Sequence, residues 1–509
     1  MKPSLILINF LLIISTLNAQ QTYRTSLGMP NQSHGGQSGV ATESGDQIMV
    51  ITDLTDTKIC SISEEGDMNW SISSPNGGSS VEAGRIILLA NGNLVAYTFD
   101  NENLTTHLVC LNQEGEVIWE KQLALSVGIS DITALSNGNL AFVANTINGQ
   151  VFMSYMSSEG QELWGKQIIN PASPALNCSE IRESATSGVL LNYYTWDGSS
   201  PCSGWMELSA DGEFLWQKLY EIGPDEYRYS GSELGSDGNY YFVGALIPQS
   251  GYQFADLLIT KLSSQGELLG HKVFADIYTD EAKDIIETSD GGLLLIGSTK
   301  PTWPCGGNTF VAKINYELDS IFTKNYGDSS GDLFGFFREL QLQNGDVYAF
   351  GSGGLSSGVG NTDAHIIKTN QNFELACSTY SWNLEVYEPA LQSESNVAIY
   401  TLDFGLAITD SNVFFTSEIQ SARICESEPV SIDKLDSSSL LLYPNPVEDF
   451  LYIDGFESSS KILIYNSIGE LVRSTFYNAD GVDVSMLSSG IYSVRVGSDQ
   501  HQLMRLSVR

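Results

Sequence analysis

The stretch DITALSNGNLAFVAN, residues 131–145, decides the fold. An apolar run ends at Ser136, the dipeptide Asn137-Gly138 follows, and a second apolar run begins at Leu140. Asn-Gly between two β-rich runs predicts a hairpin, because a type I′ turn needs positive φ at both central residues. The stretch therefore predicts two antiparallel strands joined by a tight turn.

The turn glycine of this hairpin recurs along the chain at a spacing of about fifty residues, which is typical of propeller blades. Its seven occurrences are Gly45, Gly92, Gly138, Gly188, Gly238, Gly291 and Gly345. A second hairpin follows in each unit; in this one, Val151–Met156 precedes a turn at Glu159-Gly160 and residues 162–168 follow it. Four strands per unit fit one blade. The pattern predicts an all-β, seven-bladed β-propeller over residues 20–425, with a C-terminal extension from about residue 378.

Tryptophan recurs in one register of the expected fourth strand. In four consecutive units it stands four residues after the second turn glycine, as Trp70, Trp119, Trp164 and Trp216. A large ring at a repeated position predicts packing between adjacent blades, because aromatic side chains bury a large apolar area. Stacking of these rings on a ligand is the alternative interpretation.

The N-terminal segment YRTSLG, residues 23–28, resembles a fourth strand, yet no complete unit precedes it. We expect it to complete blade seven and so close the ring, which would hide the edge strands that invite aggregation. Residues 373–380 are the competing candidate for this place.

The later units resemble a known group of repeats. The segment TSDGGLLLIGST, residues 288–299, is similar to the Asp-Gly-Gly repeats of secreted bacterial and archaeal propellers. The first four units look more like the repeats of quinoprotein-type propellers. That likeness does not extend to the cofactor, since quinoprotein dehydrogenases carry adjacent cysteines and no two cysteines are neighbours here.

The N-terminus indicates export. Met1 and Lys2 are followed by an apolar run over residues 5–17 and by Ala19, so residues 1–19 read as a secretory signal peptide. No later segment reaches the roughly 20 apolar residues that a membrane-spanning helix needs. The sequence predicts a secreted chain without a membrane span.

Export also permits disulfides, because these bonds persist in oxidising compartments. The chain has seven cysteines, an odd number that leaves at least one unpaired. The predicted pairs are Cys178 with Cys202 and Cys377 with Cys425. Cys60 and Cys110 are expected to be small buried hydrophobes, and Cys305 to be the unpaired thiol.

The composition is strongly acidic, with a formal net charge of −37. This charge repels nucleic acid and anionic membrane surfaces, so we expect binding to neither. Solubility is the plain interpretation of the charge, and binding of divalent cations or a cationic partner is the alternative.

The expected binding face carries the loops after strands two and four of each blade. Those loops lengthen in units four to seven and bring aromatic and acidic residues together. The candidate ligand-binding residues are Trp196, Tyr252, Trp303, Tyr227, Tyr229, Asp225, Asp276 and Asp280. The rings could stack on sugars or apolar side chains, and paired carboxylates could hold Ca²⁺. No other cofactor is expected, and ordinary solvated loops are the alternative.

No catalytic motif is predicted to act. The strings GDSSG at 327–331 and GLSSG at 354–358 match Gly-x-Ser-x-Gly, but a nucleophile elbow needs a helix after the serine, and no helical periodicity follows. The five histidines are scattered without zinc spacing. Catalysis by a pair of carboxylates stays open.

The C-terminal segment has its own organisation. Residues 426–439 look like a linker, and the short alternating runs over residues 440–509 predict a small immunoglobulin-like β-sandwich. The string LYPNPV, residues 442–447, with later matches at 464–471 and 487–494, closely resembles the C-terminal sorting domain of the Bacteroidetes type IX secretion system. The motif positions are Tyr443, Pro444, Asn445, Pro446, Gly490 and Tyr492. The resemblance implies export across the outer membrane and contact with the secretion machinery.

Together these patterns favour a secreted or cell-surface binding module that recognises a glycan or a protein. The competing hypothesis is a secreted hydrolase or lyase that uses carboxylates on the same long-loop face. A deep pocket with clustered acids of shifted pKa would favour the enzyme, and a shallow aromatic groove would favour binding.

Overall fold

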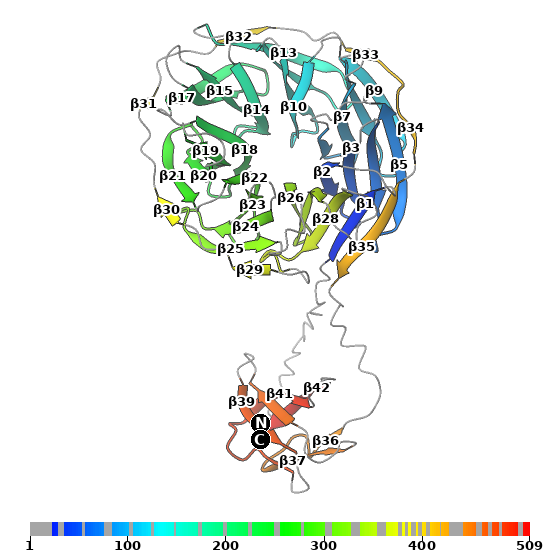
Figure 1. The fold of residues 1–509 in the computed structure, drawn as a ribbon, viewed down its shortest axis with the longest axis vertical. Helices are drawn as coiled ribbons and strands as arrows, with labels where there is room; N and C mark the ends of the chain where they lie inside the picture. The colour runs from blue at the N-terminus through cyan, green and yellow to red at the C-terminus, as the bar shows by residue number, and fades with distance from the viewer. Residues whose placement is uncertain are drawn as a thin grey trace, which may run out of the picture. The chain divides into compact units, whose positions relative to one another are not determined.

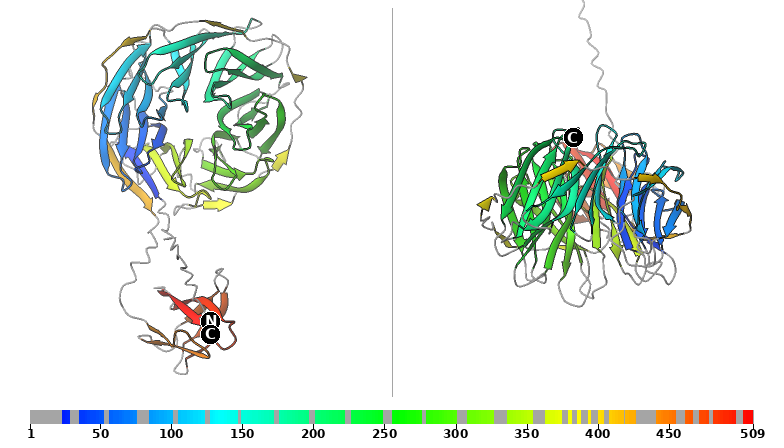
Figure 2. Two further views of the ribbon diagram at one scale, coloured as in Figure 1. Left: turned by 180° about the vertical axis from the view of Figure 1, so that it is seen from behind. Right: turned by 90° about the horizontal axis from the view of Figure 1, so that it is seen from above.

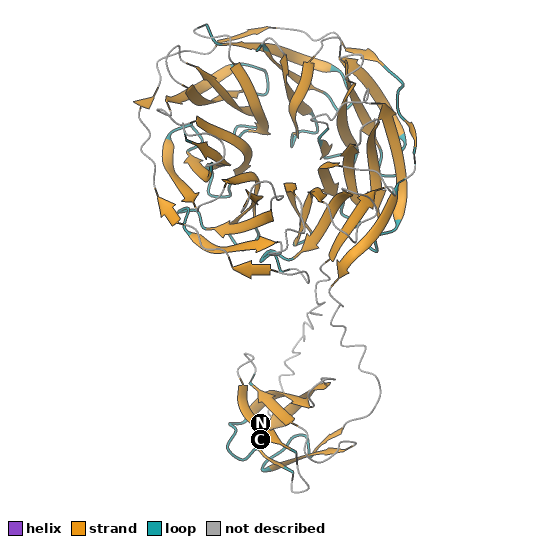
Figure 3. Ribbon diagram, viewed as in Figure 1, coloured by secondary structure: helices purple, strands orange, loops and turns teal. Residues whose placement is uncertain are grey.

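The computed structural model describes residues 23–508 apart from short segments, which include 29–34, 76–83, 249–254, 301–307, 327–335, 354–362 and 427–440. The predicted signal peptide, residues 1–19, lies outside the described residues. All the regular elements of the described chain are strands (Figure 3). The chain divides into one compact unit over Gln20–Glu428 and another that contains Pro429–Arg509.

The first unit is a ring of seven antiparallel sheets, and each sheet contains four strands of the predicted repeat (Figure 1). Blade 1 comprises β2 (Gly35–Ala41), β3 (Gln47–Thr52), β4 (Asp56–Ile62) and β5 (Met68–Pro75). Blade 2 comprises β6 (Ile86–Leu88), β7 (Leu94–Asp100), β8 (Thr105–Leu111) and β9 (Val117–Leu123). Blade 3 comprises β10 (Val127–Ala134), β11 (Leu140–Thr146), β12 (Val151–Met156) and β13 (Glu162–Ile169).

The remaining blades repeat the order. Blade 4 comprises β14 (Leu176–Glu183), β15 (Val189–Trp196), β16 (Pro201–Leu208) and β17 (Phe214–Glu221). Blade 5 comprises β18 (Glu226–Leu234), β19 (Tyr240–Ile247), β20 (Asp256–Leu262) and β21 (Leu268–Ala275). Blade 6 comprises β22 (Thr279–Glu287), β23 (Leu293–Lys300), β24 (Asn308–Ile314) and β25 (Ser320–Tyr326). Blade 7 comprises β26 (Phe336–Gln343), β27 (Asp346–Gly353), β28 (Asp363–Thr369) and β1 (Tyr23–Gly28). The predicted seven-bladed β-propeller is confirmed.

Ring closure uses the N-terminal strand, as predicted. β1 pairs antiparallel with β28, from Tyr23 opposite Lys368 to Leu27 opposite Ala364. The competing segment does not fill this place, because its strand β29 (Thr379–Ser381) pairs with β25 of blade 6. The ring is therefore closed by hydrogen bonds between strands from the two ends of the unit.

The residues after blade 7 form a belt around the ring, which we call the girdle. It contributes a fifth, outermost strand to every blade, in the order blade 6, 5, 4, 3, 2, 1 and then 7 (Figures 1 and 2). Its strands are β29, β30 (Glu385–Tyr387), β31 (Ser393–Glu394), β32 (Tyr400–Asp403), β33 (Ile408–Asp410), β34 (Phe415–Thr416) and β35 (Gln420–Glu426). The sequence indicated only a C-terminal extension here.

The first hairpin turns differ in type from the prediction. Gly138 has a φ of 87°, as a turn glycine should, but the structure gives no positive φ for Asn137. The amide of Gly138 donates to Leu135 O (2.9 Å) and that of Leu135 to Asn139 O (2.9 Å), which is the pattern of a three-residue loop with glycine in the left-handed region. Only Asn344, with a φ of 55° before Gly345, follows the predicted two-residue turn.

The repeated tryptophans pack between blades, as predicted. The indole N–H of Trp119 in blade 2 donates to Ser158 O of blade 3 (2.8 Å), and that of Trp164 in blade 3 donates to Ala210 O of blade 4 (2.8 Å). A Cβ added to Gly160 would lie 3.0 Å from the Trp119 ring, so each ring fits beneath a turn glycine of the next blade. These rings hold neighbouring blades together.

The predicted Cys178–Cys202 disulfide is wrong. Both residues are buried thiols with no bond between them. They lie on β14 and β16, on either side of β15, where Cys178 faces Tyr193 and Cys202 faces Thr195. Two strand spacings amount to about 9.5 Å, beyond the reach of about 7 Å for a disulfide. Cys60 and Cys110 are buried, as predicted.

The other predicted pair is not tested. Cys377 and the expected unpaired Cys305 lie outside the described residues, and only the backbone of Cys425 is described, in β35. The Cys377–Cys425 disulfide stays a prediction.

The second compact unit is a small two-sheet β-domain. One sheet has the order β36 (Leu441–Tyr443), β37 (Phe450–Asp454), β40 (Val482–Asp483). The other has the order β39 (Leu471–Phe476), β38 (Lys461–Tyr465), β41 (Gly490–Val496), β42 (Gln502–Val508). Val447, Leu451, Ile464 and Val494 belong to one buried core that joins the sheets. The predicted C-terminal β-sandwich is thus confirmed as a separate unit.

Candidate functional site

The predicted long-loop site falls mostly on residues outside the described chain. Tyr252, Trp303, Asp225 and Asp276 lie there. Trp196 is the last residue of β15, where its backbone pairs with Pro201. A ligand site built from these residues stays a prediction.

Three predicted site residues are buried within the blades instead. Tyr227 and Tyr229 belong to the core shared by blades 4 and 5, where the Tyr229 ring lies 5.2 Å from that of Trp205 and its hydroxyl bonds Thr260 Oγ1 (2.8 Å). Asp280 is fully buried, and its amide donates to Ala255 O (2.7 Å). Because these three side chains are buried inside the blades, they do not form part of an exposed ligand-binding surface.

A different set of charged residues meets around the ring axis. The innermost strands of six blades have a register shift near their middle, and in four of them the residue after the shift is acidic: Asp131, Glu180, Asp284 and Glu339. Such a bulge redirects the side chain that follows it. With Arg85 and Arg182, these residues form what we call the axial cluster.

Two arginines connect the acids of the axial cluster. Arg85, just before β6, pairs with the carboxylate of Asp131 and with Glu339 Oε1 (Nε–O 3.2 Å). Arg182 contacts Glu180 Oε1 (Nε–O 3.2 Å) and Asp284 Oδ1 (Nη2–O 3.7 Å). Except for Arg182–Glu180, which lies within β14, these ion pairs cross between blades around the axis.

The same carboxylates also accept main-chain hydrogen bonds from the following blade. Asp131 Oδ2 accepts from Ile181 N (2.9 Å), and Asp284 Oδ2 accepts from Leu340 N (2.8 Å). Glu339 Oε2 accepts from Gly39 N (3.1 Å), which joins blade 7 to blade 1. Because buried amides need partners and bonds to ionised acceptors are strong, these contacts fix the inner strands of adjacent blades.

Burial shapes the protonation of the cluster. It raises the pKa of Asp284 to about 7, against the opposing pull of Arg182 and Arg85. Burial likewise raises the pKa of Glu180 and takes that of the neighbouring Glu233 to about 7. The side chains of Arg85 and Arg182 are 20% and 24% exposed. In the axial cluster the two arginines are therefore partly exposed to solvent, and their acidic partners are more deeply buried.

The described residues offer no group of His, Cys, Asp and Glu arranged to hold a metal ion. The Ca²⁺ prediction rested largely on Asp225 and Asp276, which are not among them.

The sequence carried a signal for the axial cluster that was not used. Arg85, Asp131 and Asp284 each stand seven residues before the first turn glycine of their unit. A charged residue at a fixed offset within an apolar inner strand is a repeated feature of the ring. Glu180 and Glu339 miss that offset by one residue because the first turn differs in their blades: Ser187 (φ 60°) takes the place of the turn glycine in blade 4, and Asn344-Gly345 is a two-residue turn in blade 7.

The sorting motif lies on the surface and at the core edge of the second unit. The Tyr443 ring stacks on Tyr452 at 5.8 Å, and the Tyr443-Pro444 and Asn445-Pro446 bonds are both cis. Asn445 Oδ1 accepts from Ser507 N (2.9 Å). Gly490 begins β41, where the hydroxyl of Tyr492 donates to Ser488 O (2.7 Å). The motif residues therefore tie the first strand of the domain to its last.

Comparison with known families identifies the second unit. Residues 441–508 match the secretion system C-terminal sorting domain. This domain directs export to the cell surface or secretion by the type IX system, and it implies interaction with that machinery. Within the part of the chain that the structure describes, no helix is long and apolar enough to cross a membrane.

Two solved structures align with about two thirds of this chain. A catalytically inactive virginiamycin B lyase from Staphylococcus aureus with quinupristin is 11% identical, covering 68% of this chain and 99% of its own, with a TM-score of 0.46. The β-propeller domain of the Trilobed protease from Pyrococcus furiosus is 8% identical, covering 70% and 96%, with a TM-score of 0.41.

A third structure is PorZ, a surface component of the type IX secretion system of Porphyromonas gingivalis. It is 10% identical and covers 95% of this chain and 100% of its own, with a TM-score of 0.16. No curated protein sequence matches the chain. All three TM-scores lie below 0.5, and the propeller assignment rests on the strand order of the chain itself.

Proposed function

We propose that this chain is a binding protein of the cell surface or the extracellular medium, exported by its type IX sorting domain, whose propeller recognises a glycan or protein ligand through its long-loop face. Propellers commonly present loops on a rigid ring, and binding residues favour loops on such scaffolds. Closure by β1 and by the girdle supplies that rigid ring.

One observation carries the choice of binding over catalysis. Each carboxylate of the axial cluster is engaged by an arginine, a main-chain amide or a hydroxyl of another blade; Glu180, for example, accepts from Ser232 Oγ at 2.9 Å. Charged groups fixed in this way hold blades together, and a hydrolytic acid or base needs instead to reach a substrate. The cluster is therefore assigned to the scaffold.

The test is a screen of the full chain by thermal shift against oligosaccharides and peptides. A ligand at 100 times its Kd adds about 2.7 kcal/mol to the free energy of unfolding. We expect Trp196→Ala with Trp303→Ala to abolish the shift and to leave the unliganded melting temperature unchanged. The matched control is Phe214→Ala with Leu215→Ala, two exposed apolar residues of β17. Equal loss in both variants, or no ligand in the screen, would contradict the proposal.

A secreted hydrolase or lyase is the second candidate, and one observation favours it. Asp284 lies 3.7 Å from Arg182, and burial holds its pKa near 7, which suits a group that exchanges protons at neutral pH. Turnover of a glycoside substrate that is lost in Asp284→Asn, with a pH profile that breaks near 7, would support this reading. Turnover unaffected by the substitution would remove Asp284 from it.

A further inference from the structure

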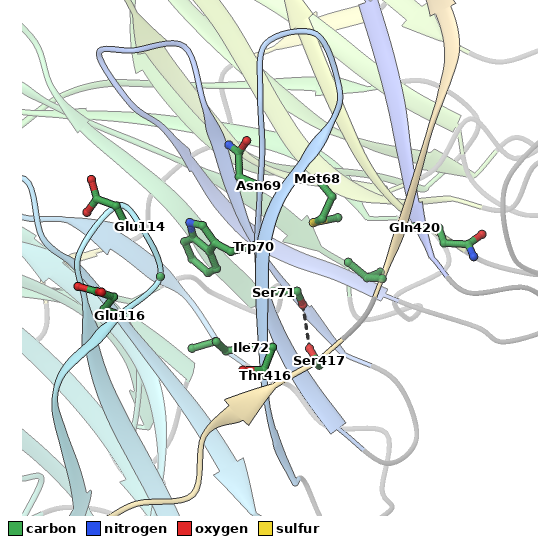
Figure 4. Close-up of a pocket in the computed structure, with 12 residues that line it drawn as sticks. Met68, Asn69, Trp70, Ser71, Ile72, Glu114, Glu116, Thr416, Ser417 and Gln420 are labelled. Carbon is green, nitrogen blue, oxygen red and sulfur yellow. Dashed lines mark hydrogen bonds between the residues drawn. The ribbon is translucent and has the colours of Figure 1, made fainter.

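A second candidate site lies on the outer edge of the ring, away from the axis. It is a cavity of about 530 Å³, which we call the rim pocket. Its walls come from three distant segments: residues 68–72 of β5, the turn 114–116 between β8 and β9, and Thr416, Ser417, Ile419 and Gln420 of the girdle (Figure 4). The pocket exists because the girdle passes there from blade 1 to blade 7.

The pocket combines an apolar wall with a carboxylate-bearing side. Trp70 and Ile72 contribute apolar surface on the side of β5 where Glu114 and Glu116 project from the neighbouring turn, and Met68 points to the other side of the strand (Figure 4). The indole N–H of Trp70 already donates to Gln113 O (2.7 Å). The ring therefore serves the pocket by its carbon surface and π face.

Blade 1 departs from the repeat at this place. Three residues after the second turn, the outer strands of blades 2 to 6 carry an aliphatic side chain that is 45% to 58% exposed: Ile118, Leu163, Leu215, Leu269 and Ile321. Blade 1 has Asn69 there, whose amide donates to Asp46 Oδ1 and Ser61 Oγ (both 3.2 Å). Departures from a repeated pattern concentrate at functional positions.

The girdle pairs with only the last part of β5, as it does with the outer strands of blades 2 to 6. Phe415 and Thr416 pair with Ser73 and Ile72, and the Ser417 amide then donates to Ser71 O (3.0 Å). Among the described residues, no strand pairs with the outer edge of β5 over residues 68–70. An open strand edge beside a pocket is the geometry that takes an extended peptide, with main-chain pairing for affinity and a pocket for one side chain.

The negative charge at the rim pocket indicates which kind of ligand side chain would bind there. The chain has a formal net charge of −37, Glu114 is exposed, and Glu116 holds one bond, from Asn112 Nδ2 (2.8 Å). A cation on an apolar stem can place its stem along Ile72, and its ammonium or guanidinium against the Trp70 indole and near the two carboxylates. Lysine and arginine have this chemistry.

We propose that the rim pocket binds a lysine or arginine of an extended basic peptide segment, whose backbone pairs with the outer edge of β5 at Met68–Trp70. This site is separate from the long-loop face, so it does not depend on the function proposed above. A neutral glycan in the same pocket is the competing occupant, and the test separates the two.

The experiment is isothermal titration of the full chain with the capped hexapeptide Lys-Val-Lys-Val-Lys-Val and, separately, with maltohexaose. We expect the peptide to bind and its affinity to fall as salt rises. The variant E114Q/E116Q should weaken binding by about tenfold or more, since charge pairs across an interface contribute on that scale. The matched control D211N/E213Q removes the same charges from the equivalent turn of blade 4 and should leave the affinity unchanged.

A second variant keeps the test independent of charge. Asn69→Ile restores the aliphatic residue of the other blades, so the chain should fold with an unchanged melting temperature while the added side chain narrows the pocket and abolishes peptide binding. No binding of the peptide, equal weakening in the two double variants, undiminished binding to Asn69→Ile, or binding of maltohexaose alone would each overturn the proposal.

Discussion

The axis and the rim of this propeller are held together by different kinds of contact. At the axis, buried side-chain charges cross between blades, as where Arg85 meets Asp131 and Glu339. At the rim, the girdle adds main-chain hydrogen bonds to each blade, with some side-chain contacts, as where Glu120 accepts from Val413 N (2.7 Å). The difference teaches that the axis should be sensitive to single substitutions and to pH, and the rim to loss of chain continuity.

Removal of the girdle should have the largest effect. Deletion of residues 379–426 uncovers the outer edge of all seven blades, and each lost hydrogen bond contributes about 1 kcal/mol. We expect the variant to lose more than about 5 kcal/mol, comparable with the whole stability of a domain, and to aggregate through its strand edges. Size-exclusion chromatography and thermal melting measure this. A monomeric variant with an unchanged melting temperature would show that the rim contributes nothing.

Loss of one axial cation should come next. Arg85→Ala leaves Asp131 and Glu339 without the guanidinium that pairs them, and breaking a buried pair costs about 3 kcal/mol. Urea denaturation of the full chain gives the free energy of unfolding. The control is Lys121→Ala, whose partner Asp410 is 87% exposed, and which should change it by less than about 1 kcal/mol. Similar losses in both variants would abolish the distinction between axis and rim.

The axis should also respond to pH. Burial raises the pKa of Asp284 to about 7 in the folded chain, so the folded chain binds this proton more tightly than the unfolded chain does. The free energy of unfolding should therefore fall as pH rises from 5 to 7, by about 2 kcal/mol from this group, and then level off. Asp284→Asn should flatten that decline, and Asp319→Asn, at an exposed rim position, should not. Parallel pH profiles for the two variants would contradict the assignment.

Side-chain pairs at the rim should matter least. In blade 5, which lacks the repeated tryptophan, Lys272 bonds Asp319 of blade 6 at 2.6 Å across the surface. Lys272→Met should cost about 0.5 kcal/mol, and the difference should vanish in about 0.5 M salt because exposed pairs are screened. A loss that persists in high salt would mean that this contact works by packing rather than by charge.

Much of the ring could be predicted from the sequence, because it depends on local sequence signals. The turn glycines, the tryptophans before the next blade's turn, and the closing strand at residues 23–28 each follow from short-range chemistry. The structure confirms them except at Gly188, where Ser187 (φ 60°) takes the turn position. The turn type was wrong at Asn137, since a three-residue loop suits the same strand twist with positive φ at the glycine alone.

The remainder depends on contacts between distant segments. The girdle strands are two to seven residues long, too short for a periodic pattern, and their pairing is set by the ring they encircle. Tyr227 and Tyr229 face the blade core because of the register of β18, which the predicted loop boundary did not capture. The axial cluster depends on bulges, and a one-residue shift decides which side chain faces the axis.

Native-state hydrogen exchange of the full chain tests most directly whether the rim holds the ring. If the girdle is part of the folded propeller, main-chain amides of β32 and β33, which pair with β13 and β9, should exchange as slowly as those of the closing strand β1. Exchange within seconds across β29–β34, while the inner strands stay protected, would show that the girdle is a loose tail and would contradict the account.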